Sequence, residues 1–196
     1  MKKIGEHKEQ RVGIFIDIQN LYHSAKNLYQ GRVNYGELLK HLTASRKLIR
    51  VIAYVVKSEG IVEMGGAKQE AAPAQNGSAT LPTSRGGESS FFEALEKEGM
   101  ELRLKDLQVY PGGMKKADWD VGMAVDAIRM ANSLDAIILV TGDGDFVPLV
   151  EYLKWGLGKQ VEVAAFGRST STRLKEVADY FINVENIPRI IIKRRV

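Results

Sequence analysis

The sequence predicts an α/β fold in which helices cover both faces of a central, mainly parallel sheet of five to six strands. Apolar runs rich in branched side chains alternate with helical segments along the chain, which is the pattern of a covered parallel sheet. Two of the runs, residues 12–16 and 136–140, are apolar throughout, as expected of strands that are buried on both faces.

The expected strands are short apolar runs bounded by turn residues. They cover residues 12–17, 49–56, 101–105, 136–140 and 160–166, with a short last strand over 181–184. The helices between them are placed partly by their boundary residues: Gly99 and Gly158 each end a helix, and Pro148 lies in the first turn of another. They cover residues 21–29, 34–42, 91–98, 118–132, 146–157 and 169–180.

One stretch, residues 58–90, differs in composition because it is rich in Gly, Ala, Ser, Pro and Gln. Such a stretch buries too little apolar surface to order itself. The segments on either side complete one sheet, so we expect a flexible insertion within a single domain of residues 11–187. The insertion is also a candidate binding segment for a protein partner. Residues 1–10 and 188–196 are expected to be basic tails.

Composition excludes several classes of protein. The chain contains no Cys, which excludes disulfides, zinc ribbons and thiol nucleophiles. Residues 1–11 lack the apolar core of a secretory signal, and no apolar run approaches the length of a membrane span. We therefore expect a cytoplasmic protein that does not associate with membranes. The formal net charge of +4 permits nucleic-acid binding without requiring it.

Two carboxylates, Asp143 and Asp145, follow the apolar run 136–140 with one Gly between them. In open α/β sheets, ligands bind beyond the carboxyl ends of the strands. Carboxylates on such a turn suit a hard divalent cation such as Mg²⁺. The alternative is structural, because Asp145 can cap the following helix and Asp143 can form an Asx-turn.

Two further positions supply carboxylates to the same edge of the sheet. Asp17 ends an otherwise apolar strand, so it requires a partner, either a Lys or a metal ion. Asp120 lies near a helix start, at the edge of an apolar face, and its alternative role is a favourable charge at the helix N-terminus. That face is expected to contain Val121, Ala124, Val125, Ile128 and Ala131, which leaves Asp126 and Arg129 facing water. Asp118 is the stronger candidate for the cap of the helix that contains Asp120. Asn20 is the candidate cap of the helix over residues 21–29.

Four carboxylates at one edge repel one another unless a cation neutralises them or some are protonated. Because the chain has no Cys and only three scattered His residues, all candidate ligands are oxygen atoms. Oxygen ligands favour Mg²⁺ or Mn²⁺ over Zn²⁺.

Three motifs resemble those of LabA-like NYN domains. They are residues 15–20 (Phe-Ile-Asp-Ile-Gln-Asn), 116–126 (Lys-Ala-Asp-Trp-Asp-Val-Gly-Met-Ala-Val-Asp) and 141–146 (Thr-Gly-Asp-Gly-Asp-Phe), and the closing strand and helix are similar as well. The resemblance covers residues 11–184 outside the insertion, and it implies a PIN-like, three-layer fold and metal-dependent ribonuclease activity. It also implies that Asp17, Asp120, Asp143 and Asp145 form the metal-binding, catalytic cluster with Asn20 beside it. Asp118 remains an alternative to Asp120, and Asp126 is expected to play a supporting role.

On this interpretation, Mg²⁺ or Mn²⁺ orients a water molecule for in-line attack on an RNA phosphodiester and stabilises the leaving oxygen. Asp145 or Asp17 helps to position that water. The candidate phosphate-binding residues lie on expected loops and helix starts. They are Lys57, Lys115, Lys116, Arg168 and Arg173, each of which is individually more typical of a solvated surface charge.

Two other functions remain open. One is a non-catalytic regulator that keeps the fold as an RNA-binding or protein-interaction module, although such a protein has no physical reason to retain four repelling carboxylates. The other is a metal-dependent phosphohydrolase acting on small molecules, which requires a closed pocket. A homodimer also remains open.

Overall fold

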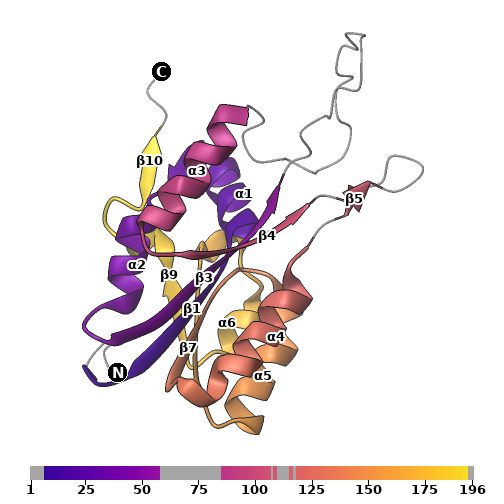
Figure 1. Cartoon of the computed structure of the whole chain (residues 1–196). Coiled ribbons are helices and arrows are strands. Elements are labelled where there is room, and N and C mark those ends of the chain that lie inside the picture. The colour runs from indigo at the N-terminus through magenta and orange to yellow at the C-terminus, as the bar shows by residue number, and fades with distance from the viewer. Residues whose placement is uncertain (1–6, 58–84, 107, 110–114, 117, 194–196) are drawn as a thin grey trace.

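A computed structural model describes residues 7–57, 85–106, 108–109, 115–116 and 118–193. Its centre is a sheet of six parallel strands in the order β4-β3-β1-β7-β8-β9 (Figure 1). The strands are β1 (Arg11–Asp17), β3 (Lys47–Lys57), β4 (Glu101–Asp106), β7 (Ala136–Val140), β8 (Gln160–Ala165) and β9 (Tyr180–Asn183). The predicted α/β class with a central parallel sheet is confirmed.

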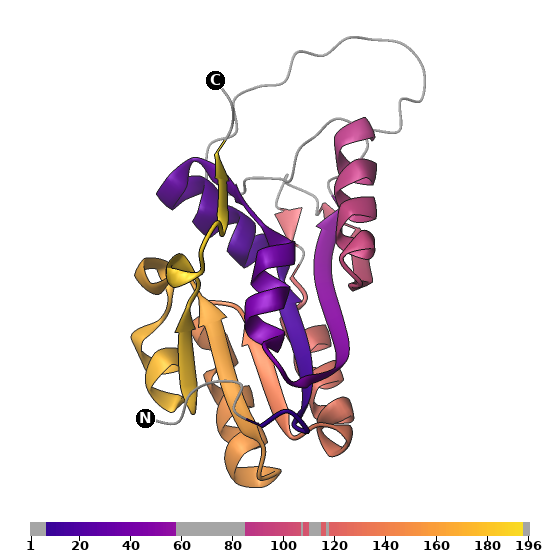
Figure 2. The same cartoon turned by 90° about the vertical axis from the view of Figure 1, so that its left-hand side faces the viewer.

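Helices cover both faces of the sheet, which produces the expected three layers (Figures 1 and 2). One face carries α1 (Ile18–Tyr29), α2 (Tyr35–Thr43) and α3 (Arg85–Lys97). The other carries α4 (Asp120–Met130), α5 (Val147–Glu151) and α6 (Thr172–Val177). A π-helical turn, η3 (Tyr152–Gly156), extends α5. None of the helices in the described residues combines the length and the apolar character of a membrane span.

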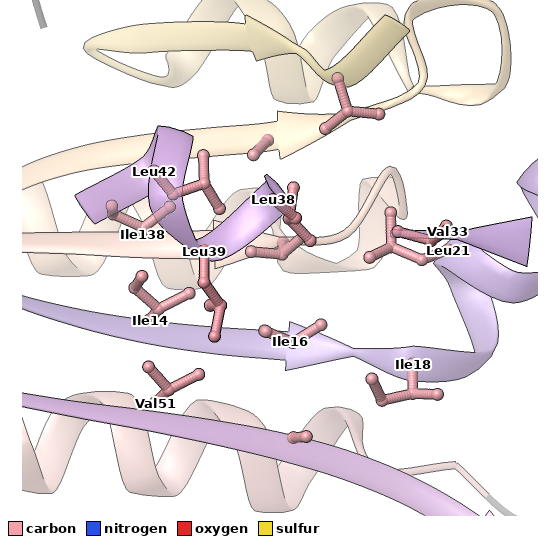
Figure 3. Packing of buried hydrophobic residues seen from close by; sticks show 14 of the residues in the cluster. Ile14, Ile16, Ile18, Leu21, Val33, Leu38, Leu39, Leu42, Val51 and Ile138 are labelled. Carbon is pink, nitrogen blue, oxygen red and sulfur yellow. The ribbon is translucent and has the colours of Figure 1, made fainter. Parts of the chain in front are cut away.

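The two central strands, β1 and β7, divide the core into two apolar clusters. In β1, Ile14 and Ile16 pack against α1 and α2, as Figure 3 shows, whereas Phe15 packs against the α4 side. All five residues of β7 are buried, and so are the five apolar residues 12–16. Burial on both faces explains why these two runs are apolar throughout instead of alternating.

The predicted buried face of α4 is only partly confirmed, because Ala131 is buried and Ala124 packs against the core, but the three larger side chains of that face are exposed. Val121 is 75% exposed, and Val125 and Ile128 are also exposed, whereas Met123 and Ala127 pack against the sheet. The physical reason is that Asp126, expected in water, forms hydrogen bonds with residues of the sheet and thereby turns its own side of the helix inward. Arg129 is exposed, as predicted.

Other differences concern the ends of elements and short strands. Helix α3 begins at Arg85, six residues earlier than predicted, and residues 58–84 of the expected insertion lie outside the described residues. Helix α6 is shorter than predicted because Ser171, not Ser169, provides its cap. Two antiparallel pairs were not predicted: β2 (Gly31–Val33) with β10 (Ile191–Lys193), and β5 (Gln108–Val109) with β6 (Lys115–Lys116).

A buried ion pair links the turn before β3 to strand β8. The side chains of Arg46 and Glu162 have no exposed surface, and their closest nitrogen and oxygen atoms lie 2.6 Å apart. Arg46 also donates to the carbonyl of Leu42, and Gln160 donates to Glu162 at 2.7 Å. Every partner is therefore needed to compensate for the removal of these two charges from water.

We predict that Glu162→Gln lowers the free energy of unfolding by about 3–5 kcal/mol, because it leaves the Arg46 charge buried without its counter-ion. Urea denaturation monitored by circular dichroism measures the change. The control is Glu101→Gln in the exposed Arg50–Glu101 pair, for which a cost of at most about 1 kcal/mol is expected. Equal costs for the two variants would contradict the prediction.

Candidate functional site

The pairing of β1 with β7 brings two polar segments together at the carboxyl edge of the sheet. Ile16 lies opposite Val140, so the residues that follow, Asp17 and Thr141, are neighbours. The Thr141 hydroxyl donates to Asp17 Oδ2 at 3.3 Å. The predicted meeting point of the first strand and the acidic turn is therefore present in the structure.

The turn after β7 uses Asp143 as a cap. Asp143 Oδ1 accepts a hydrogen bond from the backbone N–H of Asp145 at 2.9 Å, and this bond starts a single 3₁₀ turn over Gly144–Phe146. The cap uses one carboxylate oxygen of Asp143 and leaves the second able to bind a cation. Asp145 does not cap α5, whose N-cap position is occupied by Phe146. The structural alternative thus applies to Asp143 and not to Asp145.

The residue that caps α1 differs from the one expected. Asp17, and not Asn20, caps α1 by accepting a hydrogen bond from the Asn20 N–H at 3.0 Å. The Asn20 side chain instead accepts a hydrogen bond from the backbone N–H of Gly142 at 2.9 Å. Asn20 therefore links the start of α1 to the acidic turn. Among the described residues, the hydrogen-bond partners of Asp17 are the Asn20 N–H and the Thr141 hydroxyl, not a Lys.

Three of the predicted carboxylates form a group that we call the acidic cluster: Asp120, Asp143 and Asp145. Each contributes an oxygen atom that lies within 4.8 Å of the other two. Asp120 and Asp143 are half-buried, and Asp145 is exposed. Among the described residues, Asp118 does not join this group, so the structure brings Asp120 to the turn in preference to Asp118.

The residues before α4 are bound to the sheet, which determines where Asp120 lies. The indole N–H of Trp119 donates to the carbonyl of Val55 at 3.0 Å, and its ring packs against Tyr54. The ammonium group of Lys105 donates to the carbonyl of Asp118 at 2.9 Å. These contacts connect the first turn of α4 to β3 and β4.

A second contact that holds α4 on the sheet was not predicted from the sequence. The buried Tyr54 donates its hydroxyl to Asp126 Oδ2 at 3.0 Å, and Arg103 Nε lies 3.4 Å from the same oxygen. Asp126 thus attaches α4 to the sheet and does not face water, whereas its supporting role beside Asp120 stays a prediction. A Tyr in an otherwise aliphatic buried strand was the available signal, since a buried phenol requires a hydrogen-bond partner.

Asp17 lies beside the acidic cluster and is affected by its charges. Burial raises the pKa of Asp17 to about 6, and the charges of Asp120 and Asp143 add to the rise. The hydrogen bonds from Asn20 and Thr141 act in the opposite direction. Without a cation, this edge of the sheet therefore holds a carboxyl group that ionises at a higher pH than an ordinary Asp side chain.

The acidic cluster is compatible with a divalent cation such as Mg²⁺. Oxygen atoms bound to one Mg²⁺ at about 2.1 Å lie at most about 4.2 Å apart. The three carboxylates, within 4.8 Å of one another, therefore need only small side-chain rotations to share an ion. All the donors are oxygen, as expected for Mg²⁺ or Mn²⁺.

The predicted basic residues are distributed unevenly. Lys57 ends β3 and Arg168 follows β8, so they flank β1 and β7 at the carboxyl edge of the sheet. Lys57 lies 4.0 Å from Asp106, and Arg168 donates to the Tyr29 hydroxyl at 3.0 Å. Arg173, on α6, pairs with Glu151. The side chains of Lys115 and Lys116 lie outside the described part of the structure.

We predict that Asp126→Ala weakens Mn²⁺ binding by about 10–100-fold, the effect typical of removing a residue that supports a ligand. It should also lower the free energy of unfolding by about 1–3 kcal/mol, because the buried Tyr54 hydroxyl loses its acceptor. Calorimetric titration and urea denaturation measure the two effects. Val125→Ala, an exposed change on the same helix, is the control and should change neither.

We predict that Asp17→Asn raises the free energy of unfolding at pH 8 in EDTA by about 1–3 kcal/mol, since each pKa unit corresponds to about 1.4 kcal/mol. The folded-state pKa of Asp17 is raised, so its ionisation opposes folding above pH 6, and the gain should disappear as the pH falls toward 4.

The control is Asp135→Asn, which should destabilise the protein at pH 8, because Arg11 lowers the pKa of Asp135 to about 2. Urea denaturation at pH 8 and 4.5 compares the variants. Destabilisation of Asp17→Asn at both pH values would contradict the prediction.

Comparisons with known proteins agree with the fold. The chain is similar to a protein of unknown function from Vibrio parahaemolyticus whose crystal structure is known: the sequences are 26% identical, the TM-score is 0.75, and the match covers 98% of this chain and 100% of the other. No curated protein sequence matches. The model of the NYN domain matches residues 11–185, nearly the whole chain. The chain therefore belongs to the NYN domain family.

Proposed function

We propose that this NYN domain is a metal-dependent ribonuclease that hydrolyses RNA phosphodiester bonds at the acidic cluster, with Mg²⁺ or Mn²⁺ as its cofactor. The observation that carries the proposal is the convergence of Asp120, Asp143 and Asp145 within 4.8 Å at the carboxyl edge of the sheet. NYN domains are typically nucleases and generally metal-dependent, which supports the same conclusion. The three sequence motifs favour the LabA-like group within the family.

In the proposed mechanism, the acidic cluster and Asp17 would hold the cation, which when bound would activate a water and neutralise charge on the leaving oxygen. The contribution of the chain is mainly to orient these ligands. The N–H of Asp145 holds one oxygen of Asp143, and Asn20 holds the turn through Gly142. Asp17 or Asp145 would help to position the attacking water, since both carboxylates lie at this edge of the sheet.

Phosphate groups on either side of the reacting bond would contact Lys57 and Arg168. Lys57 is 41% exposed and its partner Asp106 is 88% exposed, so this ion pair costs little to open when a phosphate binds. We assign Lys116 and Arg173 secondary contacts farther along the RNA.

We predict that Asp143→Asn reduces RNA cleavage by at least about 100-fold, the scale on which a lost catalytic group is felt, and abolishes measurable Mn²⁺ binding. Asn retains the oxygen that accepts from the Asp145 N–H, so the turn itself should survive. Calorimetry with Mn²⁺ and Mg²⁺, and cleavage of a mixed-sequence single-stranded RNA, measure the two effects. Asp135→Asn removes an exposed carboxylate before β7 and should change neither.

Three outcomes separate the possible functions. If the wild type binds metal and cleaves RNA, and Asp143→Asn does neither, the ribonuclease function is supported. Metal binding without cleavage would favour a non-catalytic regulator or a phosphohydrolase for small molecules. Absence of metal binding would mean that the carboxylates only cap and form turns, and the proposed mechanism would be wrong.

A further inference from the structure

An open groove runs between α4 and the segment that contains α5 and η3. These two segments lie side by side on one face of the sheet (Figure 1). The groove has a volume of about 360 Å³, and Ala124, Ile128, Leu149 and Tyr152 are among the residues that line it. This volume lies within the range of small-ligand sites, about 300–1,000 Å³.

The apolar walls of the groove are unusually exposed. Val121, Ile128 and Tyr152 each line it, and all three have large exposed fractions, with Tyr152 at 49%. Exposed apolar side chains that line a groove form a surface on which an apolar part of a ligand can pack. In α4 they are exposed because Met123 and Ala127 occupy the side that packs against the sheet.

One end of the groove is the acidic cluster itself. Asp120 and Asp145 belong both to the groove and to the cluster, and among the described lining residues they are the only charged ones. A ligand that fits both parts has a phosphate that reaches the metal-binding carboxylates and an uncharged, flat portion beside it. A nucleotide has this composition, whereas an extended run of phosphates would meet no cation in the groove.

We propose that the groove is a nucleobase-binding subsite, in which the base next to the reacting phosphate stacks on Tyr152 and packs against Ile128. The proposal rests on the proposed ribonuclease function for the phosphate at the acidic cluster. Stacking of a base on an aromatic side chain tolerates any sequence, because every base has a π face. The subsite would therefore discriminate only weakly among the four bases, because its affinity would come from stacking and apolar contact and not from hydrogen bonds to base edges.

The test compares two ligands that differ only in the base, 5′-AMP and ribose 5-phosphate, neither of which contains a bond to be cleaved. Their dissociation constants from the Mn²⁺-loaded protein are measured by calorimetry. In the wild type, AMP should bind about 5–100-fold more tightly, which is the effect expected from one stacked base. Tyr152→Ala and Ile128→Gln, on opposite walls, should each reduce this ratio toward one.

The matched controls are Tyr152→Phe, which retains the aromatic face, and Trp155→Ala, which removes an aromatic side chain that is 82% exposed and does not line the groove. Both should preserve the wild-type ratio.

Equal binding of AMP and ribose 5-phosphate by the wild type would overturn the subsite and leave the ribonuclease proposal intact. If neither ligand binds, the subsite is also overturned, and the ribonuclease proposal is still decided separately by metal binding and RNA cleavage.

A second copy of the chain is the competing occupant. The molar mass of the wild type and of Ile128→Gln, measured by light scattering, tests it. We expect the wild type and Ile128→Gln to have the same molar mass. A wild-type dimer that Ile128→Gln converts to a monomer would show that the groove is an interface between copies, and the nucleobase assignment would be overturned.

Discussion

The site depends on the parallel pairing of β1 with β7. Because Ile16 and Val140 are opposite each other, the next residues of both strands meet, and hydrogen bonds from Thr141 to Asp17 and from Gly142 to Asn20 close the gap between them. A one-residue change in this register would turn Asp17 away from the turn, since successive side chains of a strand point to opposite faces. The two entirely apolar strands at the centre of the sheet therefore position the polar residues at its edge.

The central strands and the acidic turn were predictable because burial on both faces leaves a continuous apolar run, and because the carboxyl ends of parallel strands meet at one edge. The orientation of α4 was not. Periodicity placed Val121 and Ile128 toward the sheet, but a single hydrogen-bonded carboxylate, Asp126, decided which side faces inward. Pairings between distant segments, such as Arg46 with Glu162, leave no local pattern in the sequence and could not be predicted either.

The caps explain why the site is both ordered and electrostatically unfavourable. Asp17 and Asp143 each use one oxygen to begin a helical turn, so the backbone itself holds them close to Asp120. Burial raises the pKa of Asp17, and repulsion by Asp120 and Asp143 adds to the rise. A divalent cation would relieve that repulsion and stabilise the folded protein in proportion to its affinity.

The bond between Tyr54 and Asp126 also limits how helix α4 can move. A helix held only by apolar contacts can rotate about its axis or slide along the sheet with little loss of packing. A directional hydrogen bond to a buried phenol allows one rotational setting, and in that setting Asp120 faces the turn while the valines of α4 face solvent. The position of Asp120 and the exposed wall of the groove thus both depend on the hydrogen bond between Tyr54 and Asp126. A change that lets α4 rotate should therefore alter both.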